Sequence, residues 1–364
     1  MDNKQLYLND ILQTDPVFSN EYLSEILQLP ANSTIATKTI IEDRTTDTTR
    51  IIRLLITWKD INEGEKSKNL FLKLPIITNP ENAFDKWSMH EIDFYVNVSN
   101  AEELPIPKFV DGYISDDRKS FLLALEDISS DYFSAIEVNR NEMGNWHTAA
   151  ESLARFHSRF WNGINADRLN PLNGDNKPIE EKIKNYQEAL AKFLPYASEY
   201  YDNDILSAYN AILEDAILFE RRSQDRREKS SNISVIHGDS HIFNFMYPKA
   251  SIHRPLMMDF QFWRIGIPTI DLMNLTRVAF PFKDEPDSHL EVLKHYHSAL
   301  LGFGVTNYSC SECLQDYYLS EAISAFGPVF NYVDFGLGHE YWGQGVYDTI
   351  NNYKTVKKLV NLPL

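Results

Sequence analysis

The periodicity of apolar residues changes once along this chain, near residue 125, and that change limits the folds open to it. Before it, the apolar runs are short and strand-like, in residues 33–41, 50–58, 69–74 and 120–125, with one helical pattern near 83–98. After about residue 131, apolar residues recur every three or four positions, as on one face of a helix. We therefore predict an α+β protein with a β-rich first part and a mainly helical second part.

Three segments of the second part carry the helical pattern most clearly, residues 146–161, 205–216 and 346–360. A β-like interruption at 234–262 reads SVIHGDSHIFNFMY, a polar link and then PLMMDFQF, which predicts a hairpin with polar side chains at its ends. The charge-rich stretch 220–230, ERRSQDRREKS, is interpreted as a solvated helix end.

Composition excludes several classes of protein. The length of 364 residues fits about two domains. A net charge of −17 disfavours binding to nucleic acids and to anionic membranes, which leaves small molecules or cationic partners. No apolar run approaches the ~20 residues that span a bilayer. Cys310 and Cys313 are the only cysteines, and the N-terminus lacks a secretory pattern, so we expect a cytoplasmic protein.

Two acids and an amide stand close together in the β-like interruption. Asp239 and Asn244 lie in HGDSHIFN, and Asp259 follows in MDFQ. Oxygen ligands of this kind suit Mg²⁺, which takes one or two carboxylates and completes its shell with water and phosphates. Phosphoryl transfer needs such ligands together with a carboxylate that orients and deprotonates an acceptor hydroxyl. The spacing therefore predicts a phosphotransfer site.

HGDSHIFN followed by MDFQ resembles the catalytic segment of aminoglycoside phosphotransferases and choline kinase-like small-molecule kinases. LLALEDIS at 122–129, LARFH at 153–157 and DFQFWRIGIPTIDL at 259–272 resemble the ecdysteroid kinase-like branch most. The resemblance implies a two-lobed protein-kinase-like fold, with a nucleotide-binding lobe at 1–127 and a catalytic and acceptor-binding lobe at 128–364. It also implies that ATP and Mg²⁺ are used to phosphorylate a hydroxyl of a small organic molecule.

The resemblance assigns roles to five residues of the second part of the chain. It makes Asp239 the catalytic base and makes Asn244 and Asp259 the Mg²⁺ ligands. His237 would brace the loop that carries the base, and Asp271 would be a buried structural anchor beneath that loop.

In the first part, the resemblance makes Lys73 the strand lysine that contacts nucleotide phosphates and Glu91 the helix acid that pairs with it. Leucines flank Lys73 on both sides, so its ammonium is partly desolvated and needs a nearby anion to stay charged. The linker that includes Glu126 and Ile128 would offer backbone groups to an adenine edge.

The stretch 42–50, EDRTTDTTR, stands where protein kinases carry a glycine-rich phosphate loop, and it contains no glycine. Its threonine hydroxyls can donate to phosphate, but Glu42, Asp43 and Asp47 would repel it. A catalytically inactive, nucleotide-binding pseudokinase-like module is therefore the alternative to an enzyme. A protein kinase is disfavoured because no APE-like activation segment follows Asp259.

Residues 304–348 hold six acids, ten aromatic residues and no Lys or Arg. Acids mixed with aromatic faces suit a cationic or amphiphilic acceptor. The alternative is that the aromatic residues form core and the acids face solvent.

Two histidines and two cysteines need a separate interpretation. His157 lies on the apolar face of its predicted helix, so we expect a hydrogen-bonded core histidine. His241 is equally compatible with packing and with lining the site. Cys310 and Cys313 form a single C-x-x-C without further metal-ligand spacing, so they are expected to be thiols without a function.

Overall fold

The computed structural model describes residues 18–46, 49–75, 85–98, 104–114, 121–163, 177–250, 254–282, 285 and 287–360. These residues form two compact units. Unit 1 holds the chain up to Tyr132 together with Met258–Phe262, and unit 2 holds Phe133–Met257 and the chain from Trp263 onward. The predicted change from strands to helices is confirmed.

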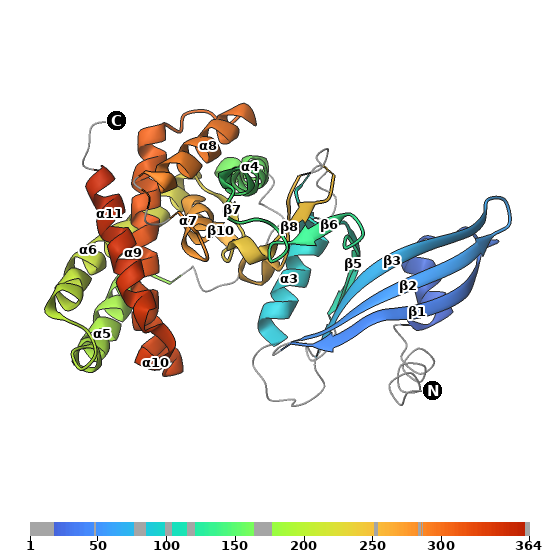
Figure 1. Ribbon diagram of the computed structural model, residues 1–364, viewed down its shortest axis with the longest axis horizontal. Coiled ribbons are helices and arrows are strands. Elements are labelled where there is room, and N and C mark those ends of the chain that lie inside the picture. The colour runs from blue at the N-terminus through green and yellow to red at the C-terminus, as the bar shows by residue number, and fades with distance from the viewer. Residues whose placement is uncertain are drawn as a thin grey trace. The chain divides into compact units, whose positions relative to one another are not determined.

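An antiparallel five-stranded sheet forms most of unit 1, in the order β1-β2-β3-β5-β4. Figure 1 shows β1, β2 and β3 as three long strands side by side. The bounds are Thr34–Thr45 for β1, Thr49–Asp60 for β2, Gly64–Pro75 for β3, Phe109–Ile114 for β4 and Phe121–Glu126 for β5.

The core of unit 1 follows from strand alternation. Alternate residues of β2 and β3 are buried on one face of the sheet. They pack with Phe18 and Leu23, which bring the helix α2 (Asn20–Ile26) onto this face. The buried strand residues are Ile52, Leu54, Ile56, Leu70, Leu72 and Leu74.

A second helix of unit 1, α3 (Asp85–Val98), packs against the short 3-10 helix η5 (Phe260–Phe262). The rings of Phe94 and Phe260 stack with centroids 4.0 Å apart, and His90 Nδ1 donates to the Gln261 carbonyl at 3.0 Å. These contacts explain why a segment so late in the sequence belongs to unit 1.

Unit 2 is helical, as predicted, and α9 and α11 lie side by side in it (Figure 1). The stripe that includes Trp146, Leu153 and His157 is fully buried on α4, so the predicted helix and its buried face are confirmed. The bounds are Met143–Arg159 for α4, Ile179–Ala197 for α5, Asn203–Lys229 for α6, Thr269–Arg277 for α7, Ser288–Gly302 for α8, Cys310–Phe335 for α9, His339–Trp342 for α10 and Gln344–Val360 for α11.

Short strands and 3-10 helices interrupt the helices of unit 2. The strands pair differently from the single hairpin that the sequence predicted. β8 (Phe245–Pro248) pairs with β9 (Leu256–Met257), whereas β7 (Ser234–Ile236) pairs with β10 (Arg264–Gly266). The chain turns after β7 at Gly238, whose φ of +84° is a conformation that glycine adopts readily. β7 therefore ends before this turn and is not a strand of the predicted hairpin. The remaining short elements are β6 (Tyr132–Ser134), η2 (Trp161–Gly163) and η4 (Ile242–Asn244).

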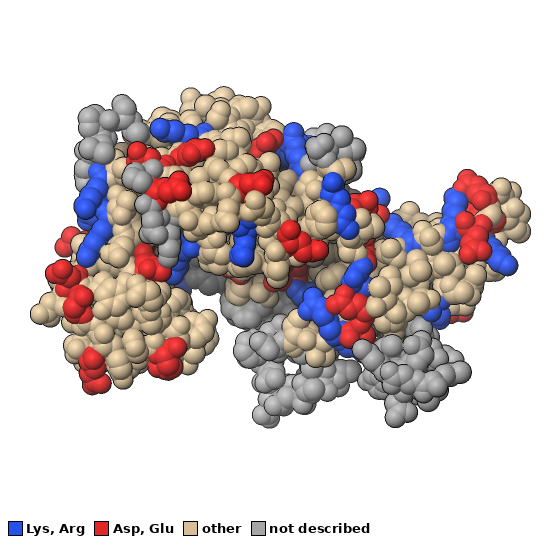
Figure 2. Space-filling view, in the orientation of Figure 1, with Lys and Arg blue, Asp and Glu red and all other residues tan. Residues whose placement is uncertain are grey.

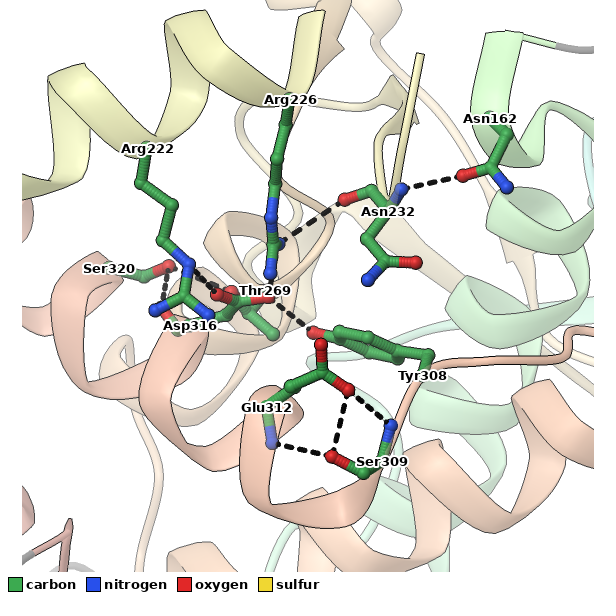
Figure 3. A network of polar contacts seen from close by, with 10 residues as sticks. All are labelled: Asn162, Arg222, Arg226, Asn232, Thr269, Tyr308, Ser309, Glu312, Asp316 and Ser320. Atoms are coloured by element: carbon green, nitrogen blue, oxygen red, sulfur yellow. Dashed lines mark hydrogen bonds and ion pairs between the residues drawn. The ribbon is translucent and has the colours of Figure 1, made fainter. Parts of the chain in front are cut away.

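The charge-rich stretch 220–230 is the end of α6, but it is solvated only in part. Arg226 is 7% exposed, because one face of this helix end meets α9. In the network drawn in Figure 3, Arg222 Nε lies 2.9 Å from Asp316 Oδ1 and Arg226 forms an ion pair with Asp316 Oδ2. The prediction of a solvated helix end is therefore wrong for this face.

No helix within the described ranges combines the length and the apolar character needed to cross a membrane. Cys310 and Cys313, at the start of α9, are free thiols.

Candidate functional site

Lys73, Glu91 and Asp259 form one ionic cluster inside unit 1. The Nζ of Lys73 lies 2.7 Å from Oε2 of Glu91 and 2.7 Å from Oδ1 of Asp259. Both leucines that flank Lys73 on β3 face the core, so strand alternation directs Lys73 to the opposite face of the sheet. The expected contact between Lys73 and Glu91 is present, and Asp259 joins it.

Electrostatics keep this lysine charged. Burial lowers the pKa of Lys73, but the charges of Glu91 and Asp259 outweigh burial and raise the pKa above its usual value. Burial raises the pKa of Glu91, although Lys73 and the Phe260 amide oppose the shift. One ammonium between two carboxylates leaves an excess of negative charge, which favours a cation beside the cluster.

Asp259 is the accessible member of the cluster, with its side chain 35% exposed against 3% for Glu91. Its φ of +68° is a left-handed conformation, which Asp tolerates better than bulkier residues. Among the described residues, only Lys73 bonds to its carboxylate, through Oδ1. The second oxygen of Asp259 is therefore available to a ligand.

Asp239 and Asn244 lie in unit 2, in the loop between β7 and β8. The Nδ2 of Asn244 donates to the Asp239 carbonyl at 2.7 Å, which leaves the Asn244 amide oxygen to accept.

Each of the two predicted ligands, Asn244 and Asp259, offers a hard oxygen of the kind that Mg²⁺ prefers beside waters and phosphates. Across the described part of the chain, no three His, Cys, Asp or Glu side chains gather into a metal-binding group. The sequence predicts only two protein ligands for Mg²⁺, one carboxylate and one amide oxygen. Such a pair does not make up a group of three His, Cys, Asp or Glu side chains.

The loop that carries Asp239 is fixed from below by Asp271. The amides of His237 and Gly238 donate to the Asp271 carboxylate at 2.6 and 2.8 Å, and Ser240 Oγ donates to its carbonyl at 2.8 Å. Within the loop, the Asp239 amide donates to Nδ1 of His237 at 3.2 Å. The expected bracing by His237 and the buried anchor at Asp271 are both present.

His241 lies beside Asp239, a placement that the sequence left open. Its Nε2 is 3.6 Å from Oδ2 of Asp239, and the side chains are 26% and 36% exposed. The position of His241 two residues after Asp239, in HGDSH, was the sequence signal that could have singled out this histidine.

The linker after β5 contains the predicted nucleotide-contacting residues Glu126 and Ile128, and backbone groups of both residues are already bonded. The Ile128 carbonyl accepts from the amides of Asp131 and Tyr132, while the Ile128 amide bonds to no other group in the described part of the chain. The Glu126 amide donates to the Lys108 carbonyl at 2.9 Å. Arg53, which the sequence did not indicate, fixes the linker through Asp127 at 2.9 Å.

The glycine-free stretch is mostly strand, because β1 continues to Thr45 and β2 begins at Thr49. Asp43 forms two hydrogen bonds with Arg50, at 2.9 and 2.8 Å, and Glu42 forms an ion pair with Arg44 at 2.9 Å. These arginines offset the repulsion expected between the two acids and a phosphate. Asp47 lies outside the described residues.

The acidic and aromatic stretch 304–348 was expected either to bind a cationic or amphiphilic acceptor or to combine core aromatic residues with solvent-facing acids. Neither interpretation describes the whole stretch. Asp316 and Glu321 are buried rather than solvated, and Asp316 is bound by the two arginines and by the hydroxyl of Tyr308 at 2.7 Å (Figure 3). Tyr317 and Phe326 belong to the core. In contrast, Phe335 and Tyr341 are 72% and 63% exposed.

Comparison with known proteins identifies the fold. A Ralstonia eutropha protein with a provisional assignment as an aminoglycoside phosphotransferase superposes with a TM-score of 0.55 at 11% identity, covering 93% of this chain and 98% of its own. A Streptococcus pneumoniae choline kinase gives 0.48 at 16% identity, with coverages of 97% and 99%. A Plasmodium vivax ethanolamine kinase gives 0.45 at 15% identity, with coverages of 100% and 95%.

The likeness to the Ralstonia protein confirms the predicted kinase-like fold with a β-rich first part and a helical second part. No sequence among the curated proteins matches this chain. The sequence model of the ecdysteroid kinase-like family matches residues 46–303, which is more than two thirds of the sequence. The chain therefore belongs to the ecdysteroid kinase-like family.

Proposed function

We propose that this protein is an ATP-dependent phosphotransferase that moves the γ-phosphoryl group to a hydroxyl of a small organic molecule. The observation that carries the proposal is the cluster of Lys73, Glu91 and Asp259, in which a buried ammonium is held between two carboxylates at 2.7 Å. Family membership and the kinase-like fold support the same activity.

Each proposed role follows from local chemistry. Asp239 orients the acceptor hydroxyl and takes its proton as oxygen attacks the γ-phosphorus, while the bond between this phosphorus and the β,γ-bridging oxygen breaks and ADP leaves. Asn244 and Asp259 hold Mg²⁺, which neutralises phosphate charge when bound. Lys73, oriented by Glu91, binds phosphate oxygens and stabilises the charge that develops on them.

The nucleotide base is assigned to the linker after β5. The backbone at Glu126 and Ile128 meets the adenine edge, and the Ile128 amide is the donor for it. Asp127 holds this linker in shape, because it accepts from Arg53 and from the Ser129 amide at 3.0 Å.

The acceptor in this proposal is cationic or amphiphilic. Support comes from the end of unit 2, where the rings of Tyr200 and His339 stack at 4.7 Å and Tyr341 is largely exposed beside the exposed Glu340. Over α5 and α10, Figure 2 shows mainly uncharged surface in which Asp and Glu predominate among the charged side chains. Aromatic faces beside acids bind organic cations.

The second candidate is an inactive, nucleotide-binding pseudokinase-like module. It is favoured by the turn between β1 and β2, which lacks glycine and is closed by the Thr46 amide donating to the Thr49 carbonyl at 2.7 Å. For either candidate we propose a cytoplasmic location, in which the thiols of Cys310 and Cys313 stay reduced, and no nucleic-acid or membrane partner.

A thermal-shift measurement with Mg·ATP, followed by an ATP-consumption screen over amino alcohols, aminoglycosides and steroid alcohols, separates the candidates. The kinase predicts a raised melting temperature and phosphorylation of at least one acceptor class. Binding of Mg·ATP without turnover on any class would favour the pseudokinase-like module. Absence of both binding and turnover would contradict both candidates.

A further inference from the structure

The imidazole of His157 connects two buried groups of unit 2. Its Nδ1 lies 2.7 Å from the hydroxyl of Tyr296, on α8, and its Nε2 lies 3.0 Å from Oδ2 of Asp271, on α7. All three side chains are completely buried. The same carboxylate receives the amides of His237 and Gly238, so His157 acts on the loop that carries Asp239 through one shared group.

The carboxylate and the phenol restrict how protons are arranged along this chain of hydrogen bonds. Burial raises the pKa of Asp271, but the hydrogen bond from His157, the electrostatic effect of the His157 and His237 imidazoles and the His237 amide outweigh burial and lower it, so this carboxylate only accepts. The Nε2 of His157 must therefore donate to it. Burial raises the pKa of Tyr296 well above its usual value, so its hydroxyl keeps its proton and is a donor to Nδ1 of a neutral imidazole.

We infer that His157 is a positioning residue for the proposed base. It fixes the rotation of the Asp271 carboxylate and, through the amides of His237 and Gly238, the backbone conformation that presents Asp239. Tyr296 fixes the tautomer of His157. This inference rests on the proposed role of Asp239, but the geometry of the loop can be tested without any enzymatic activity.

Independent contacts hold α7 itself, which separates the effect of His157 from the position of the helix. Thr269 Oγ1 lies 3.0 Å from Ser320 Oγ, and this serine donates to the Asp316 carbonyl at 2.8 Å (Figure 3). Asn274 Nδ2 donates to the Gly238 carbonyl at 3.2 Å. Loss of His157 therefore frees the carboxylate while α7 remains anchored.

The variants separate the effect of the His157 hydrogen bonds from the effect of its packing in the core. His157→Leu removes both polar contacts, His157→Gln keeps a donor near the Nε2 position, and Tyr296→Phe removes only the hydroxyl that sets the tautomer. The matched control is His297→Gln, because His297 is also buried, lies on α8 beside Tyr296 and bonds to the Tyr308 carbonyl at 2.8 Å instead.

The readout is amide hydrogen exchange of the peptide that covers residues 236–240, measured on the full chain together with kcat and the KM for Mg·ATP. A hydrogen bond to a charged group contributes about 1.5–3 kcal/mol, so His157→Leu is expected to accelerate exchange at His237 and Gly238 about tenfold or more. The kcat should fall by a similar factor with the KM nearly unchanged. His157→Gln should recover most of both, and the control should change neither.

Exchange at His237 and Gly238 that matches the wild-type rate in folded His157→Leu would overturn the inference, and so would acceleration spread evenly over unit 2. If His157→Leu does not fold, Tyr296→Phe decides, with about threefold faster exchange confined to the loop as the expected result and the wild-type rate as the contrary one. A wild-type protein without turnover would contradict the proposed function, whereas the exchange result would still decide the role of His157.

Discussion

The ammonium of Lys73 lies 2.7 Å from the Glu91 carboxylate, whose side chain is only 3% exposed. Among the described residues, Lys73 is the one cation paired with this buried carboxylate, whereas Asp259, the other partner of the lysine, is accessible to water. The stability of unit 1 and the proposed phosphate contact rest on the same pair.

This dependence predicts that Lys73→Met destabilises the protein by about 3 kcal/mol, because Glu91 is left buried and unpaired. The double variant Lys73→Met/Glu91→Gln should regain most of that free energy, since no charge is then buried, yet it should remain without turnover. Urea denaturation and an ATP-consumption assay measure the two quantities. Additive losses of stability in the double variant would contradict the account.

Asp316 is predicted to hold α6 against α9. Asp316→Asn should lower the free energy of unfolding by about 3 kcal/mol, because Arg226 is then buried without a counter-charge. Ser309→Ala, which removes the N-cap hydroxyl of α9, should cost about 1 kcal/mol. The exposed Asp334→Asn is the control and should change stability by less than about 0.5 kcal/mol. A loss in Asp316→Asn no larger than in the cap variant would refute this role.

Glu321 makes stability depend on pH. Burial raises its pKa to about 7, against the opposing effects of Arg277 and Tyr317. The folded protein therefore holds this proton more tightly than the unfolded chain, whose Glu titrates near ~4.3. The resulting stabilisation is complete below the unfolded pKa and is lost as pH rises through about 7.

Glu321→Gln cannot ionise, so we expect it to match the wild type near pH 4 and to exceed its unfolding free energy by roughly 3–4 kcal/mol near pH 8. Denaturation curves at both pH values measure the difference. The exposed Glu340→Gln should show no such divergence. Parallel pH profiles for Glu321→Gln and the wild type would disprove the assignment.

The parts of the fold that local pattern determines were predictable. The apolar stripe of α4 has helical spacing over many residues, and it also predicted His157 as a hydrogen-bonded core histidine, which the contacts with Tyr296 and Asp271 confirm. The pairing of β7 with β10 was not predictable, because strands of three residues carry almost no pattern and their partners are chosen by tertiary contacts.

The site followed from the resemblance more than from pattern. HGDSHIFN and MDFQ single out Asp239, Asn244 and Asp259 as a set, while their catalytic and metal-binding roles stay predictions. Arg226 was misread, because a charged run has the same composition on a solvated and on a buried helix face, and its partner Asp316 lies 90 residues away.

The most direct test is phosphoryl transfer by Asp239→Asn to the best acceptor from the screen, with Mg·ATP binding measured on the same sample. An amide keeps the shape of the carboxylate but cannot take the proton, so we predict turnover reduced about 100-fold or more and a Kd for Mg·ATP within about threefold of the wild type. Turnover at the wild-type rate would show that Asp239 is not the base.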